Sequence, residues 1–85
     1  MTTDADLLRQ VGPALFGEHW QTPLARALDV SDRSVRRWAA GTADVPEGAW
    51  DEMIELLHER TDAVMATRHA LIRRIAGVAA EASAK

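Results

Sequence analysis

Three arginines within five residues, Arg33, Arg36 and Arg37, are the strongest chemical signal in the chain. On an α-helix they would lie on one side, opposite Val35 and Trp38, which can share a buried face. A guanidinium group donates paired hydrogen bonds to phosphates, carboxylates and the edge of guanine. Taken alone, such a run is most often a solvated helix face, so the flanking sequence has to decide between the two interpretations.

Positive charge is concentrated around these arginines, although the chain as a whole is acidic. The formal net charge is −3 at pH 7. Residues 21–40 hold four arginines and two aspartates, a local charge of +2, whereas residues 44–59 hold six acidic residues and no lysine or arginine. The net charge would not attract a polyanion, and the 21–40 region is the part that could bind one.

The periodicity of the apolar residues predicts an all-α fold of four or five helices with a long C-terminal helix, because no segment alternates like a strand. We expect the first helix to begin after Thr3 as its N-cap and to end at Gly17. Gly12 and Pro13 lie within its apolar stripe, so this helix should be kinked or interrupted there. The stripe comprises Leu7, Leu8, Val11, Leu15 and Phe16.

Capping residues predict the limits of two further short helices. Thr22 is a favourable N-cap for the second, with Pro23 at the first helical position and a stop at Asp29. Ser31 should cap a third helix over residues 32–40, which Gly41 would end.

Beyond Pro46, apolar residues recur at alternating spacings of four and three from Trp50 onwards, which predicts a heptad-like helix over about residues 47–80. Thr61 and Arg68 interrupt the stripe. Either the helix breaks near Thr61 and folds back, or a second copy of the chain covers it. We favour a homodimer, with an interface that includes Val64, Leu71, Ile75 and Val78.

Residues 21–40 resemble the helix-turn-helix unit of phage-type repressors, the Cro-like (XRE) family. Ala25 stands where the two helices must approach closely, and Gly41 and Pro46 follow the unit as they do in the family. Asp29 departs from the pattern, since glycine is usual at that turn position. Five apolar positions also match: Leu24, Leu28, Val30, Val35 and Trp38. The resemblance covers about residues 5–58.

The resemblance implies a DNA-binding domain at residues 4–58 and a C-terminal extension at 59–80 that serves dimerisation. Helix 32–40 would enter the major groove of double-stranded DNA. The residues that contact bases would then be Ser31, Asp32, Arg33, Arg36 and Arg37. Those that contact phosphates would be Gln21, Thr22 and Arg26.

A protein of this kind would be a transcriptional regulator, most simply a repressor that binds a palindromic operator as a homodimer. Asp32 could accept from cytosine, or it could instead orient a neighbouring arginine. The alternative is a helical protein-interaction module, such as an antitoxin or adaptor, that uses the acidic 44–59 face and the C-terminal helix.

Other classes of function have little support in the sequence. His19, His58 and His69 lack the spacing of metal ligands, and no nucleophile or phosphate-loop motif occurs, so we expect no metal, no cofactor and no enzymatic activity. No apolar run reaches the roughly 20 residues of a membrane span. The first ten residues, MTTDADLLRQ, lack the pattern of a secretory signal. We therefore expect a cytoplasmic protein without a membrane partner.

Overall fold

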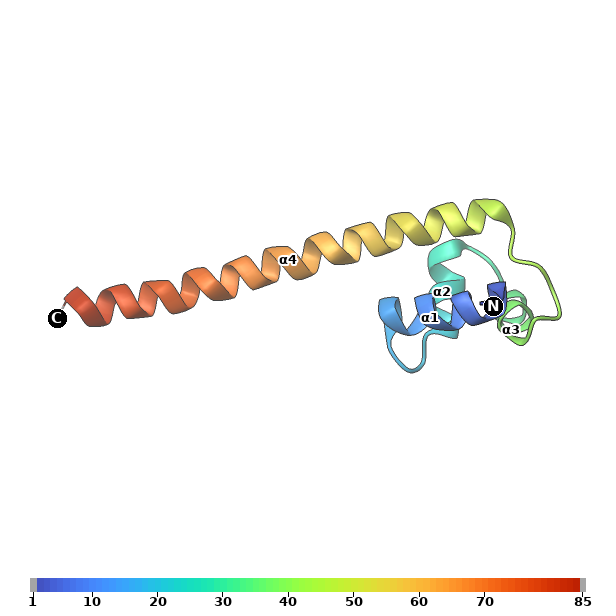
Figure 1. The fold of residues 1–85 in the computed structure, drawn as a ribbon, viewed down its shortest axis with the longest axis horizontal. Helices are drawn as coiled ribbons and strands as arrows, with labels where there is room; N and C mark the ends of the chain where they lie inside the picture. The colour runs from blue at the N-terminus through green and yellow to red at the C-terminus, as the bar shows by residue number, and fades with distance from the viewer. Residues whose placement is uncertain (1, 85) are drawn as a thin grey trace.

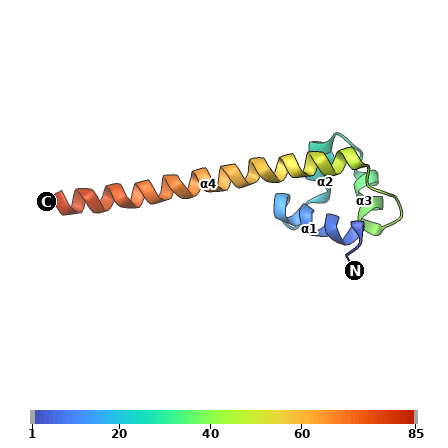
Figure 2. The same cartoon turned by 45° about the horizontal axis from the view of Figure 1, so that its top comes forward.

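The computed structural model describes the backbone of residues 2–84 and the side chains of residues 2–77. The chain forms four helices, α1 (Asp4–Phe16), α2 (Gln21–Leu28), α3 (Asp32–Ala40) and α4 (Glu47–Ala84). No strand occurs in the part that the structure describes, which confirms the all-α class. Figures 1 and 2 show α1, α2 and α3 gathered at the start of α4, while the rest of α4 extends away from them.

The ends of α1 agree with the sequence, but its continuity does not. Thr3 and Asp6 form a reciprocal capping box at the start, and Gly17 ends the helix with φ at 79°. Of the two forms expected at Gly12 and Pro13, a kink or an interruption, the interruption is wrong, because α1 continues to Phe16. Pro13 lies near the end of the helix, so its ring removes only the one hydrogen bond that the Arg9 carbonyl would accept. The Gly17 N–H then bonds the Pro13 carbonyl at 2.9 Å.

Gly12 is required by the buried indole of Trp20. A Cβ atom at Gly12 would lie 2.1 Å from Cδ2 of Trp20, so the ring packs directly against the backbone of α1. The Gly12-Pro13 pair therefore marks a close approach between two segments. Trp20 is buried and belongs to the core.

The start of α2 differs from the prediction by two positions. Trp20, with helical φ and ψ of −84° and −19°, occupies the N-cap position, and its carbonyl accepts the first helical bond from the Leu24 N–H at 2.9 Å. The assignment of Thr22 as the N-cap is thus wrong, because the backbone is already helical at Trp20, two residues earlier. Pro23 is the third helical residue, still in the first turn, where its missing N–H leaves no helical bond unmade.

The turn between α2 and α3 is closed by backbone bonds around Asp29. This residue adopts the left-handed conformation, with φ at 56° and ψ at 47°, which aspartate tolerates better than most residues. The Val30 N–H reaches back to the Ala25 carbonyl at 2.9 Å. Ser31 caps α3 by accepting from the Ser34 N–H at 3.1 Å, and left-handed Gly41 ends it. The predicted limits of α3 are confirmed.

The core lies between α1, α2, α3 and the first turns of α4. Four of the five predicted apolar positions of the α2–α3 unit are buried, and Val30 is half-buried against them. Leu7 is an exception to the predicted α1 stripe, because it remains 41% exposed. The buried apolar residues are Leu8, Leu15, Trp20, Leu24, Ala25, Leu28, Val35, Trp38, Ala39, Val45 and Met53.

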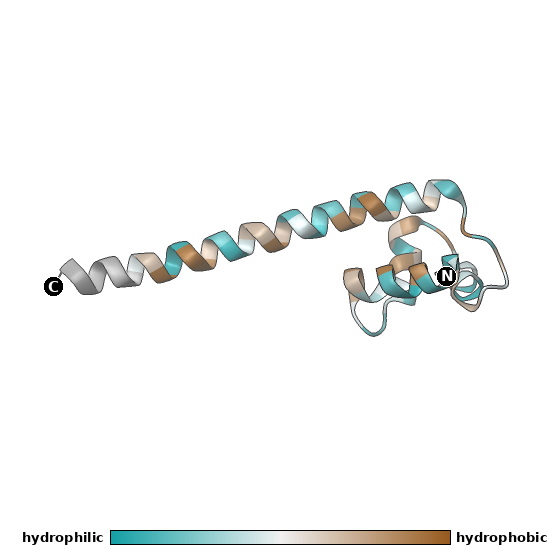
Figure 3. Ribbon diagram, viewed as in Figure 1, coloured by the Kyte–Doolittle hydropathy of each residue, from teal (hydrophilic) through white to brown (hydrophobic). Residues whose placement is uncertain are grey.

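α4 is one continuous helix, so the alternative in which it breaks near Thr61 and folds back is wrong. It packs on α1 and α2 through its first turns, with Met53 fully buried and Trp50, Leu56 and Leu57 partly buried. Every side chain from residue 58 to residue 77 is exposed. Figure 3 shows apolar residues recurring along this free part. Among the described residues no helix is apolar enough over a sufficient length to cross a membrane.

The contact between Gly12 and Trp20 gives a direct test of the core. We expect Gly12→Ala to lower the free energy of unfolding by about 1–3 kcal/mol, because the added methyl group overlaps a buried ring. Gly48→Ala is the matched control, since a Cβ there has nothing within 4 Å, and its stability should be unchanged or slightly raised. Urea unfolding at equal protein concentrations measures both. Equal stability of the two variants would contradict the packing described.

Candidate nucleic-acid interface

Burial of one side fixes the orientation of α3. Val35 is fully buried, and Trp38 and Ala39 are nearly so. α3 packs against both α1 and α2, so its inner face is held from two directions. The three arginines of α3 project from the other side, as the spacing predicted.

The outer side of α3 presents Arg33, Arg36 and Arg37 together. All three are exposed, and within residues 2–77 their guanidinium groups make no ion pair or hydrogen bond. At about 100° per residue, they lie within roughly 100° of arc on the helix. Their donors are therefore free to meet a ligand from one direction. A planar guanidinium suits phosphate oxygens or the O6 and N7 atoms of guanine.

Ser31 and Asp32 lie at the N-terminus of the same helix. The Ser31 hydroxyl is engaged in capping and lies 3.0 Å from the Ser34 hydroxyl. Asp32 is half-exposed in the first turn, where the positive end of the helix dipole favours a carboxylate. The two ion pairs among the described side chains involve neither residue, so Asp32 does not pair with an arginine of α3. Its carboxylate oxygens are available as acceptors.

The predicted phosphate contacts lie at the start of α2. Gln21 and Thr22 are its first two residues, and Arg26 is exposed one turn further along. No side chain caps this helix, so its first backbone N–H groups can serve an anion. A shallow hollow of about 250 Å³ lies beside them, lined by Glu18, His19, Trp20, Gln21 and Thr22. Glu18 is the one acidic group in that lining.

Arg9 connects α1 to the far end of α3, a contact that the sequence analysis missed. Its guanidinium donates to the Ala39 carbonyl and to the Asp6 carboxylate. Asp6 in turn accepts from the Thr3 N–H at 3.2 Å. A cation at a helix C-terminus is favourable because the carbonyl ends carry partial negative charge. The i, i+3 spacing of Asp6 and Arg9 is visible in the sequence, but their approach to a carbonyl 30 residues away is not.

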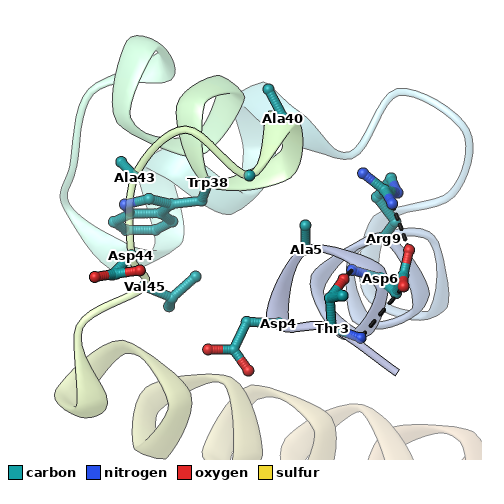
Figure 4. A pocket seen from close by; sticks show the side chains of 11 residues that line it. Thr3, Asp4, Ala5, Asp6, Arg9, Trp38, Ala40, Ala43, Asp44 and Val45 are labelled. Atoms are coloured by element: carbon teal, nitrogen blue, oxygen red, sulfur yellow. Dashed lines mark hydrogen bonds and ion pairs between the residues drawn. The ribbon is translucent and has the colours of Figure 1, made fainter. Parts of the chain in front are cut away.

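A hollow lies beside this contact (Figure 4), between the start of α1 and the loop after α3. Its volume is about 530 Å³. Three carboxylates line it, on Asp4, Asp6 and Asp44, while its arginine, Arg9, is already engaged. An acidic lining does not suit a polyanion, so the exposed face of α3 is the better candidate interface.

The predicted dimer residues are separate from the arginine face and lie along the free part of α4. Val64 is 58% exposed, Leu71 59% and Ile75 68%. The side chain of Val78, the fourth predicted position, lies outside the described residues. The three described positions share one side of the helix, because they recur at spacings of seven and four.

No protein-family model, curated protein or solved structure matches this chain. The assignment of the interface therefore depends on the residues themselves. No group of three or more His, Cys, Asp or Glu side chains that could hold a metal ion occurs in the described part of the chain.

The link between Thr3, Asp6 and Arg9 predicts a pH-dependent stability. Hydrogen bonds from Thr3, followed by Arg9, lower the pKa of Asp6 below its ordinary 3.8. A carboxylate with a lowered pKa stabilises the folded state above the ordinary value, and this contribution is lost as the pH falls through the lowered pKa. We expect Asp6→Asn to lower the melting temperature at pH 6, and the difference between the two proteins to disappear as the pH falls through the lowered pKa.

Asp4→Asn is the matched control for this prediction. It removes a carboxylate from the same first turn, but Asp4 does not belong to the capping box or to the Arg9 contact. It should change stability less than Asp6→Asn at pH 6. Thermal unfolding followed by circular dichroism from pH 2 to pH 7 measures all three proteins. An unchanged difference between wild type and Asp6→Asn across this range would contradict the pH dependence.

Proposed function

We propose that this protein is a sequence-specific DNA-binding transcriptional regulator that inserts the exposed face of α3 into the major groove. It binds a palindromic operator as a homodimer and represses most simply by blocking polymerase. A cytoplasmic location is part of the proposal, since phage-type repressors act on bacterial DNA there. The observation that carries the proposal is an arginine face that forms no ion pair within residues 2–77, on a helix whose other side is anchored in the core.

The charge of the protein favours specific contacts to bases over binding by electrostatic attraction alone. A protein with a net charge of −3 has little long-range attraction for DNA, so its non-specific binding should be weak. One well-placed bidentate contact from arginine to guanine discriminates by about 1–3 kcal/mol against the wrong base. Three arginines on one face can thus supply most of the specificity of a half-site. Asp32 adds an acceptor for cytosine N4 at the start of the helix.

The start of α2 supports the same mode of binding. Its uncapped N–H groups and the exposed Thr22 and Arg26 side chains can hold phosphates. Such contacts set the position and tilt of the protein on the duplex without reading sequence. In this proposal, α2 holds the backbone of the DNA while α3 reads the bases.

A second candidate function is favoured by the apolar side chains exposed on α4. Large exposed apolar surfaces mark sites of protein association. A helical antitoxin or adaptor would use this surface, together with the acidic residues 44–59, to bind another protein. The two functions are compatible, because the arginine face and the apolar side chains belong to different helices.

The arginine face has a quantitative test. Arg36→Ala should weaken binding to the preferred duplex by about 1–3 kcal/mol and relax the sequence preference at one position. Combined replacement of Arg33, Arg36 and Arg37 by alanine should abolish specific binding. The control is Arg60→Ala, which removes the same charge outside α3; at a concentration where light scattering shows this variant to be dimeric, its affinity should be nearly unchanged. Fluorescence anisotropy at about 0.15 M salt is the measurement. An unchanged affinity of the triple variant would eliminate α3 as the reading helix.

The dimer has its own test. We expect Leu71→Asp and Ile75→Asp each to give a monomer in light scattering and to weaken binding to the operator, because each places a charge in an apolar interface. Ala66→Asp is the matched control, since Ala66 lies on the opposite side of the same helix and should leave the dimer intact. A monomeric wild-type protein at micromolar concentration would contradict the homodimer.

A further inference from the structure

We propose that two copies of α4 pair in antiparallel orientation around a two-fold axis at the level of residue 66, between the stripe positions Val64 and Arg68. The resulting dimer would carry its two DNA-binding domains at opposite ends. This inference rests on the homodimer part of the proposed function and does not depend on DNA binding. Three features of α4 support it: a long uncovered apolar stripe, the symmetric spacing of that stripe, and the distribution of charge along the helix.

Apolar side chains on one side of α4 remain exposed for most of the described length of the helix, and we call this row of side chains the stripe. At 1.5 Å per residue, the helix beyond Leu57 extends about 40 Å past its last contacts with the domain. In proteins most of the stability of a helix comes from packing of its apolar face, so a partner surface on this stripe would stabilise the segment. The large exposed apolar side chains fall within about 120° of arc on an ideal helix. They are Ile54, Val64, Met65, Leu71, Ile72 and Ile75.

The spacing of the central stripe reads the same in both directions. Its positions are 57, 61, 64, 68, 71 and 75, separated by four, three, four, three and four residues. Reversal about residue 66 therefore places each stripe position beside another stripe position. Thr61 would meet the partner's Leu71, and Val64 would meet the partner's Arg68. Leu57, which packs partly on the domain, would lie at the edge of the pair beside the partner's Ile75. A second copy of this chain is thus a complementary surface for the stripe.

Charge is segregated along α4 in a way that favours the antiparallel direction. Residues 47–59 carry five acidic residues and no lysine or arginine. Residues 60–77 carry four arginines and one aspartate, a charge of +3. An antiparallel pair places the acidic part of each helix along the basic part of the other, which is attractive. A parallel pair places five carboxylates beside five carboxylates.

Arg68 distinguishes the two directions most sharply, because it lies in the middle of the stripe. A parallel pair would place Arg68 directly against the same residue of the partner within an apolar seam, which leaves two like charges partly desolvated. The antiparallel pair places Arg68 beside the partner's Val64. Isoleucine at 54 and 75 with leucine at 57 and 71 is a pattern also found in parallel dimers. The apposed arginines and carboxylates outweigh this packing preference.

The antiparallel pair also has a consequence for the operator. Ile54 is 62% exposed, whereas Trp50, Met53 and Leu57 pack on the domain, so the partner helix would pass beside the domain on the side of Ile54. Figure 1 shows α3 near the start of α4, and the two starts would lie on the order of 60 Å apart along the pair. If DNA is bound as proposed, half-sites spaced by about two turns of the duplex fit this separation better than one turn.

The direction of pairing can be measured without DNA. The chain has no cysteine, so Thr67→Cys and Ala76→Cys each accept one nitroxide label at an exposed site on a flank of the stripe of α4. Double electron–electron resonance then gives the distance between the two labels of a dimer. We expect a short distance for residue 67 and a distance longer by about 20 Å for residue 76, because only the labels at residue 76 are separated by about 30 Å along the axis. Addition of Leu71→Asp to the Thr67→Cys protein should remove the coupling.

Two results would overturn the proposal. Similar short distances at both sites would show a parallel pair, and absence of coupling at both would show that α4 does not bind its own copy. Circular dichroism of the labelled proteins confirms that the helices are retained. The label distances test only the pairing of α4, and the arginine variants test only DNA binding. Either proposal can therefore fail while the other holds.

Discussion

Close contact between short helices determines where the arginine face lies. α2 and α3 have eight and nine residues, too few to be stable as isolated helices, so their stability comes from packing. The contacts are close because small residues lie at the crossing points. Gly12 admits the Trp20 ring, and Ala25 and Ala39 are buried where a larger side chain would separate the helices. These contacts leave one side of α3 outside the core, and its three arginines occupy that side.

The second feature of the chain is an exposed apolar surface on α4. The domain buries its apolar residues well, yet α4 carries an apolar stripe that the rest of the chain does not cover. A single-domain chain of 85 residues has modest stability of its own, so association through α4 would add to it. Dimerisation would thus serve both stability and the reading of a two-fold symmetric operator. The arginine face and the apolar stripe belong to one function under this proposal.

Much of the fold could be predicted because its signals are local. Side-chain caps begin two helices, at Thr3 and Ser31, and glycines with positive φ end them, at Gly17 and Gly41. The spacing of three and four residues between apolar positions identifies the inner face of α3. The errors arose from tertiary contacts. Burial of the Trp20 ring moved the start of α2, and the role of Gly12 depends on a ring eight residues away. The hydrogen bond from Arg9 to the Ala39 carbonyl has no sequence signature, since any backbone carbonyl could accept it.

The central claim is that the α2–α3 unit reads a DNA sequence, and the most direct measurement is selection of bound duplexes from a random library at about 0.15 M salt. The wild-type protein and the variant with alanine at positions 33, 36 and 37 should be run side by side. We expect the wild type to enrich an inverted repeat with guanine in each half-site and the variant to enrich none. Recovery of no sequence above background by the wild type, or of the same sequence by both proteins, would show that α3 does not read DNA.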